Sequence, residues 1–178
     1  MSVSTLTRLT DLEMRPYLTD AGDIADELAG KVGLYAIYDA EQVLQYVGYS
    51  RDVAAGLKLH LVRQPAQCHW VKVQTVQRPS RTVLEEMRSA WIAEHGAMPA
   101  GNAADQAAWE KPIDAKVQMT AEERSAIAAA TDLDKIKLLK NLARRVQADI
   151  LETLKARGAT LDLRFNPKLK EQGLLDLK

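Results

Sequence analysis

Apolar residues follow two spacings along this chain, one typical of strands and one typical of helices. Residues 33–38 and 43–47 are short, apolar and rich in β-branched or aromatic side chains. The four residues between them, 39–42, predict a β-hairpin with a longer loop. Residues 69–76 alternate in polarity and predict a third strand, and the alternation alone leaves open which face of that strand is buried.

Helical spacing appears between and after these strands. Ser50 and Ser80 are candidate N-caps for helices over residues 51–62 and 81–95, and Gly96 is placed to end the second of these. A shorter helix is predicted within residues 17–29, with Asp20 as its N-cap and Gly30 as its end.

The second half of the chain is mainly helical in pattern. Thr120 and Glu123 have the spacing of a capping box, which predicts a short helix after residue 120. A long helix over residues 132–157 follows from apolar residues spaced by threes and fours: Leu133, Ile136, Leu139, Leu142, Val146, Ile150 and Leu154. Residues 161–165 predict one more short strand.

These elements predict an α+β fold, in which a small three-stranded sheet, mixed or antiparallel, is flanked by helices and followed by a helical C-terminal extension. The corresponding domain division is an N-terminal helical lead-in over residues 1–30, an α+β domain over 31–112 and the helical extension over 113–178.

Composition narrows the range of functions. The 178 residues include 24 Lys and Arg against 24 Asp and Glu, so a nucleic-acid partner would have to bind a local basic patch rather than a generally basic surface. The single cysteine, Cys68, permits neither an intrachain disulfide nor a cysteine-based zinc site, as expected in a reducing compartment. Without an apolar leader or an 18-residue apolar run, we expect a cytoplasmic protein with no membrane partner.

Two tyrosine motifs connect this pattern to a known family. Gly33-Leu34-Tyr35 and Tyr46-Val47-Gly48 fall on the two hairpin strands, and a helix, a strand, a second helix and Pro99-x-x-Asn102 follow them. Over about residues 30–102 this order resembles the GIY-YIG nuclease superfamily. Within it, the sequence is similar to the domain that precedes a monothiol glutaredoxin in plant chloroplast proteins, and to stand-alone cyanobacterial versions. The Cys-Gly-Phe-Ser motif of the glutaredoxin part is absent here.

The resemblance implies a metal-dependent DNA endonuclease that hydrolyses phosphodiesters. Tyr35 and Tyr46 would then activate and position the water, and strand alternation would place them on one sheet face if the strands pair in register. Arg51 would contact the phosphate, and Glu86 would hold Mg²⁺ or Mn²⁺. For contacts with DNA the candidates are Lys58, His60 and Asn102.

Two departures from the family pattern favour an alternative function. The usual arginine position falls on Gly56, and the usual glutamate position falls on Arg88 or Ser89. The alternative is a catalytically inactive module that binds DNA or a protein and is linked to a glutaredoxin-type redox partner through Cys68.

Each candidate residue also has a simpler structural interpretation. Tyr35 and Tyr46 suit the core of a sheet, and Arg51 and Glu86 suit solvated helix positions. Asn102 suits a turn, and Cys68 suits a buried apolar site. The long helix is either a packing surface or a basic stripe for the DNA backbone, formed by Lys135, Lys137, Lys140, Arg144 and Arg145.

Overall fold

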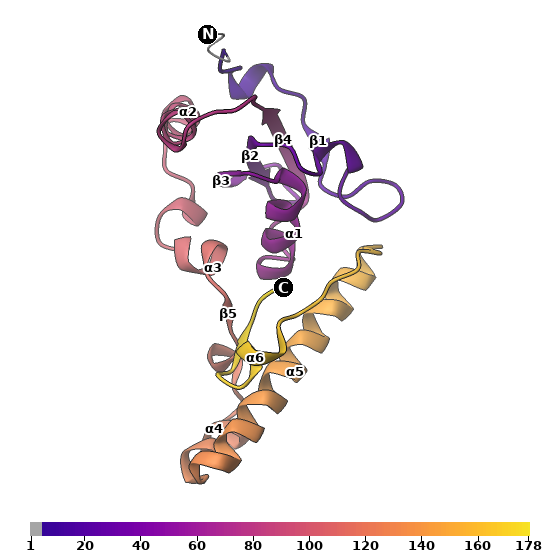
Figure 1. Cartoon of the computed structure of the whole chain (residues 1–178), viewed down its shortest axis with the longest axis vertical. Coiled ribbons are helices and arrows are strands. Elements are labelled where there is room, and N and C mark those ends of the chain that lie inside the picture. The colour runs from indigo at the N-terminus through magenta and orange to yellow at the C-terminus, as the bar shows by residue number, and fades with distance from the viewer. Residues whose placement is uncertain (1–4) are drawn as a thin grey trace. The chain divides into compact units, whose positions relative to one another are not determined.

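The computed structural model describes residues 5–178, so the first four residues of the expected lead-in lie outside the described part. It has an α+β architecture and divides into two compact units, which meet in sequence at Glu110 and Lys111. Figure 1 shows the elements of both units. Within residues 5–178, no helix is both long enough and apolar enough to cross a membrane.

The first unit is built on an antiparallel four-stranded sheet with the strand order β1-β4-β2-β3. The expected hairpin is present as β2 (Gly33–Tyr38) and β3 (Leu44–Ser50), and the expected third strand is β4 (Trp70–Thr75). A fourth strand, β1 (Arg15–Pro16), pairs with β4 at one edge. An edge tolerates proline because the missing N–H leaves no partner unsatisfied there.

Helices cover both faces of this sheet (Figure 1). One face lies under α1 (Val53–Arg63), and the other lies under α2 (Arg81–His95). On the α2 face, strand side chains pack with side chains of the helix into one apolar cluster, which includes Leu34, Tyr38, Leu84, Met87 and Trp91.

The N-caps of α1 and α2 can be compared with the capping residues expected from the sequence. Ser80 caps α2 as expected, because its hydroxyl accepts a hydrogen bond from the Val83 backbone N–H at 3.2 Å. The expected Ser50 cap of α1 is wrong: Asp52 accepts from the Ala55 N–H at 3.1 Å, while the Ser50 hydroxyl donates to the Asp52 carbonyl. β3 therefore runs through residue 50 before the helix begins.

The N-terminal segment differs most from expectation, since residues 17–29 do not form an α-helix. Turns run through this stretch, and a single 3-10 turn lies at Asp26–Leu28. Gly22 has a φ of 81°, which interrupts a right-handed helix near its expected start.

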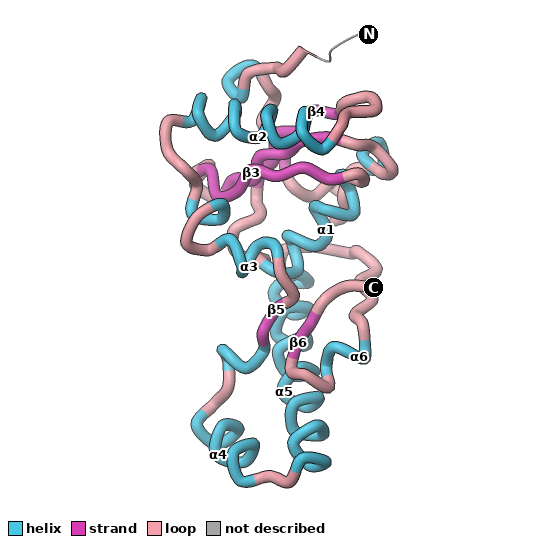
Figure 2. Tube along the Cα trace, turned by 60° about the vertical axis from the view of Figure 1, so that its left-hand side comes forward, coloured by secondary structure: helices cyan, strands magenta, loops and turns pink. Residues whose placement is uncertain are grey.

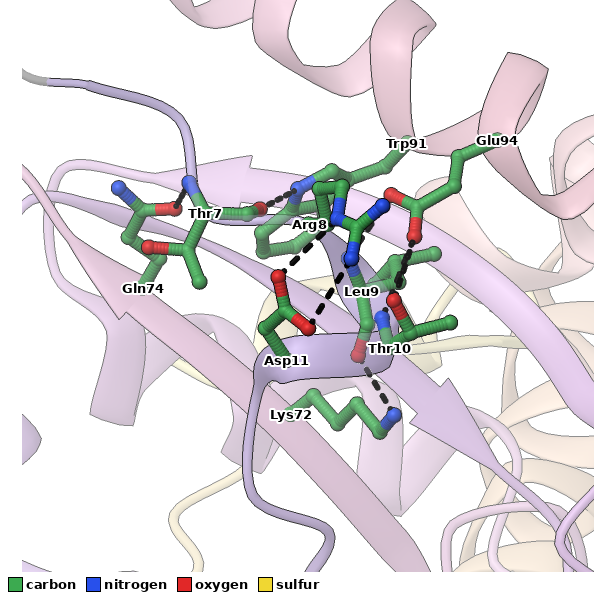
Figure 3. A network of polar contacts seen from close by, with 9 residues as sticks. All are labelled: Thr7, Arg8, Leu9, Thr10, Asp11, Lys72, Gln74, Trp91 and Glu94. Atoms are coloured by element: carbon green, nitrogen blue, oxygen red, sulfur yellow. Dashed lines mark hydrogen bonds and ion pairs between the residues drawn. The ribbon is translucent and has the colours of Figure 1, made fainter.

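Residues 7–11 instead form a strap across α2 and β4 (Figure 3). The Glu94 carboxylate accepts from the Leu9 N–H at 2.8 Å, the Trp91 indole donates to the Thr7 carbonyl at 2.9 Å, and the Lys72 ammonium donates to the Leu9 carbonyl at 2.7 Å. The strap therefore ties its own backbone to side chains of both elements.

The second unit has α5 (Asp132–Ala156) as its longest element, with α4 (Ala121–Ala129) packed beside it (Figure 2). The capping box of Thr120 and Glu123 is present. Arg145 joins the two helices through a 2.8 Å ion pair with Glu123. The rest of the unit contains β5 (Ile113–Asp114), α6 (Pro167–Lys170) and β6 (Leu174–Leu175), which pairs with β5.

One expectation for this unit is wrong. Residues 161–165 form no strand, and only a single bridge joins Phe165 to Leu177. The apolar stripe of α5 is buried from Leu139 onward, whereas Leu133 is 69% exposed and Ile136 is 40% exposed. The first turns of α5 therefore continue the apolar spacing without burial.

Candidate functional site: a closed tyrosine pocket

The two motif tyrosines lie together on the α1 face of the sheet. Tyr35 pairs with Gly48 and Ile37 pairs with Tyr46, which directs both phenols to the same face because opposed residues share a face. Their ring centroids are 6.4 Å apart. Gly48 leaves the room for this approach: a Cβ there would lie 2.5 Å from the Tyr46 ring.

His60 of α1 lies against both phenols. Its Nε2 is 2.9 Å from the Tyr35 hydroxyl, and its ring centroid is 4.6 Å from that of Tyr46. Tyr35 is 2% exposed, Tyr46 4% and His60 5%, so all three rings belong to the interior of the first unit.

A short helix, α3 (Gln106–Glu110), closes the pocket. Trp109 stacks on Tyr46 with ring centroids 5.1 Å apart and planes 6° from parallel. The Tyr46 hydroxyl donates to the Glu110 carboxylate at 2.9 Å, and Glu110 is itself exposed. The pocket thus ends in one carboxylate at the surface.

Burial determines the charge state of the pocket. Loss of solvation raises the pKa of both phenols above its ordinary value, and for Tyr46 the nearby Tyr35 and Glu110 add to that effect. Burial also lowers the pKa of His60 to about 3, and the Arg63 guanidinium acts in the same direction. At neutral pH the three groups are therefore two phenols and a neutral imidazole.

This charge state works against base catalysis by Tyr35. A phenol becomes a general base only when its surroundings favour the phenolate. Here its hydrogen-bond partner is an imidazole that resists protonation, so transfer of the phenolic proton to His60 is opposed at both ends.

Gly56 lies where the family pattern would place an arginine. A Cβ at this position would be 3.0 Å from the Tyr35 hydroxyl and 3.1 Å from the Ser50 Cβ. The space beside the phenol is thus already filled to contact distance.

The structure does not group Arg51 or Glu86 with the tyrosines. Arg51 is exposed in the turn between β3 and α1, and it lines a cleft with Tyr49, whose side chain belongs to the α2 face of the sheet. Glu86 is exposed on α2, and the helix packs on the face opposite Tyr35.

The tyrosine pocket does not fit the expected Mg²⁺ or Mn²⁺. Glu110 is the carboxylate that touches Tyr46, and it already accepts the phenolic hydrogen bond, whereas Mg²⁺ held by a single carboxylate depends on substrate phosphates for further ligands. Across residues 5–178, no cluster of three or more His, Cys, Asp or Glu side chains is placed to hold a metal ion.

The remaining candidates lie as follows. Lys58 is half-buried on α1, and His60 is inside the pocket. The Asn102 side chain accepts from the Val47 N–H at 2.8 Å and donates to the Val47 carbonyl at 2.7 Å, which is a structural role at the edge of β3. Cys68 is 0% exposed, and its thiol donates to the His60 carbonyl at 3.5 Å.

Sequence reasoning missed Trp109 and Glu110. They follow Tyr46 by more than sixty residues, so no local periodicity connects them to the hairpin. The available signal was one large aromatic residue in an otherwise small and polar stretch.

Part of this chain is similar in sequence to a known plant protein. Over 103 residues, or 56% of the chain, it is 39% identical to the bifunctional monothiol glutaredoxin-S16, chloroplastic, of Arabidopsis thaliana. The match covers 33% of that protein, so the chain spans about a third of the length of the curated relative that it matches. No protein-family model matches the chain.

Proposed function

We propose that this chain is a binding module on a GIY-YIG-like scaffold that no longer hydrolyses phosphodiesters. The observation that carries the proposal is the closed tyrosine pocket, in which the Tyr35 hydroxyl is 2.9 Å from His60 and only 2% of the residue is exposed. A scissile phosphate would need to displace α3 and Trp109 before it reached either phenol.

The electrostatics of the pocket support the same proposal. Phosphodiester hydrolysis needs cations where charge develops on the phosphate. Gly56 supplies none beside Tyr35, and packing against Ser50 and the phenol leaves little room for one. The cation whose charge reaches Tyr35 and His60 is Arg63, which donates to the Trp109 carbonyl at 3.0 Å. Raised phenol pKa values also disfavour a tyrosinate near neutral pH.

A plasmid-nicking assay tests the proposal. Purified full-length protein is incubated with supercoiled DNA and Mg²⁺ or Mn²⁺, beside Tyr35→Phe and Glu110→Gln. We expect no metal-dependent nicking above the background of the variants. Nicking by the wild type that falls at least about tenfold in Tyr35→Phe would overturn the proposal.

An active endonuclease is the second candidate, and one contact favours it. Glu110 is exposed and accepts from the Tyr46 hydroxyl, so a carboxylate joins the pocket to solvent. In that case movement of α3 would open the pocket, and Trp109→Ala would raise nicking. We expect that variant to lose stability without gaining activity.

A glutaredoxin-type partner remains part of the proposed binding role, because the Arabidopsis protein that this chain resembles over part of its length is a bifunctional monothiol glutaredoxin. Burial of Cys68 argues that such a partner would contact other surfaces first. Pull-down with a monothiol glutaredoxin, compared between wild type and Cys68→Ser, distinguishes binding through a mixed disulfide at Cys68 from binding through other surfaces. Unchanged capture by the variant would support contact without a mixed disulfide.

A further inference from the structure

The α2 face of the sheet carries a cationic cleft away from the tyrosine pocket. Its volume is about 590 Å³, within the usual range of roughly 300–1,000 Å³ for small-molecule sites. It is lined by three arginines, Arg51, Arg78 and Arg81. The half-buried Tyr49 and the apolar Val32 and Leu84 line it as well. We call this the arginine cleft.

The three arginines come from separate places in the chain. Arg51 follows β3, Arg78 lies in the connection from β4 to α2, and Arg81 is the first residue of α2. All three are exposed, so their guanidinium groups face solvent. Within the part of the chain that the structure describes, no carboxylate forms a salt bridge with Arg51 or Arg78.

Glu85 contacts the cleft residue Tyr49, and its charge is matched by another residue. Glu85 accepts from the Tyr49 hydroxyl at 2.6 Å and from the Arg88 guanidinium, also at 2.6 Å. Arg88 in turn lies over the Tyr49 ring, 5.5 Å from its centroid. Arg88 and Arg81 both act on Glu85, so the four arginines here outnumber this one carboxylate and leave a local excess of positive charge in a chain whose formal net charge is zero.

The backbone at Arg78 adds an independent observation. Its φ is 46°, in the left-handed region that favours glycine and that few other residues adopt. A non-glycine residue held there costs folding stability, and such outliers concentrate at binding sites. Arginine at this position therefore points to a requirement for its side chain.

We propose that the arginine cleft binds the phosphate of a nucleotide unit, either a free nucleotide or one nucleotide of a nucleic-acid strand. Guanidinium groups form paired, charge-assisted hydrogen bonds with phosphate oxygens, and the cleft has room for a sugar and base beside Tyr49. The proposal rests on the binding role proposed above and names a ligand class for it. Phosphate binding by the arginines does not depend on whether the tyrosine pocket hydrolyses a substrate.

Fluorescence anisotropy of the full-length chain with a labelled single-stranded DNA of about 12 nucleotides, at about 50 mM salt, tests the cleft. We expect Arg51→Ala/Arg81→Ala to weaken binding at least about tenfold and to reduce the salt dependence, since two phosphate contacts are lost. The matched control is Arg124→Ala/Lys155→Ala, which removes two exposed cations of the other unit that lie outside the basic stripe of α5 and should change affinity less than about twofold.

Arg78→Gly separates binding from folding. Glycine accepts a φ of 46° without strain, so the melting temperature should stay the same or rise, whereas affinity should fall about three- to tenfold. Competition with AMP and with inorganic phosphate distinguishes the sources. Displacement by AMP indicates a free nucleotide, and displacement by unlabelled strand alone indicates nucleic acid; both support the phosphate chemistry.

Binding within twofold of wild type in the cleft variants would overturn the inference. So would an equal loss in the Arg124→Ala/Lys155→Ala control, or no binding of any of the three probes. Nicking activity plays no part in these outcomes, so failure of the cleft and failure of the non-hydrolytic proposal remain distinguishable.

Discussion

The two faces of the four-stranded sheet use their polar groups in opposite ways. On the α1 face, the Tyr35 hydroxyl lies 2.9 Å from His60 and the Tyr46 hydroxyl donates a hydrogen bond to Glu110, and the pocket is closed. On the α2 face, the core is apolar, but its rim carries exposed arginines around an open cleft of about 590 Å³. The residues that carry the family resemblance are thus not the residues available to a ligand.

This difference separates two kinds of information in a sequence motif. The tyrosine and glycine positions specify how β2, β3 and α1 pack, and in that packing Gly56 lies beside Tyr35. A functional site also needs access and uncompensated charge, which a motif does not encode. Each of the following substitutions alters one face of the sheet, and the unaltered face serves as the comparison.

Gly56→Arg should have the largest effect. The new side chain would enter a helix position where even a Cβ lies 3.0 Å from the Tyr35 hydroxyl. Overpacking and a buried unpaired cation should lower the free energy of unfolding by about 5 kcal/mol, well beyond the gain of about 1 kcal/mol in helix propensity. Urea denaturation measures this, with Lys58→Arg as a control on the same helix. A stable variant that also nicks DNA would show that the pocket is a vacated active site rather than core.

Trp109→Ala should follow in magnitude. Trp109 is 2% exposed and stacks on Tyr46, so truncation removes most of the cover of the pocket. We expect a loss of about 3–4 kcal/mol in unfolding free energy, and about 1 kcal/mol for Trp109→Phe, which keeps an aromatic ring. Thermal denaturation followed by circular dichroism compares the two. Equal, small losses would mean that α3 is not part of the closed face.

His60 should make the closed face sensitive to acid. Its folded pKa of about 3 lies below the ordinary value of 6.5, so the unfolded chain binds the proton more readily between these limits. The contribution of neutral, buried His60 to the free energy of unfolding is fully present above about pH 6.5, and it falls by roughly 1.4 kcal/mol per pH unit as pH decreases toward 3.

Unfolding free energies measured between pH 7 and 5.5, where most carboxylates stay ionised, isolate this effect. His60→Gln should flatten the slope over that interval, while His95→Gln, at an exposed position of α2, should leave it unchanged. The same slope in both variants would place the acid sensitivity outside the tyrosine pocket.

Arg51→Ala should have the smallest effect on folding. Its side chain is exposed and makes no salt bridge among the described residues, so unfolding free energy should change by less than about 0.5 kcal/mol. A loss above about 1 kcal/mol in urea denaturation would show that the rim of the arginine cleft is structural, and would remove the contrast between the two faces.

Local rules predicted the elements that local contacts determine. The hairpin, α2 with its Ser80 cap and α5 follow from periodicity and capping chemistry, which act within a few residues. Fold class follows from their order. The strap at residues 7–11 and strand β1 depend on partners such as Glu94 and Val71, more than fifty residues away, and no local pattern encodes them.

The site shows the same limit. Strand alternation correctly placed Tyr35 and Tyr46 on one face, because the register of a hairpin is local. The closing residues Trp109 and Glu110 reach the pocket through tertiary packing, and burial itself sets the pKa of His60. Access to a pocket is a property of the whole fold, so the sequence could not foretell that this one is sealed.

Asn102 has one more consequence, at the free edge of β3. Its amide is bonded to both the N–H and the carbonyl of Val47, much as a neighbouring peptide unit would be. The pair of groups that would otherwise template a strand from another molecule is thereby occupied. Asn102→Ala should leave this edge open to self-association, which light scattering at rising protein concentration would detect, so that a residue of a nuclease-like motif would here serve to keep the chain from aggregating.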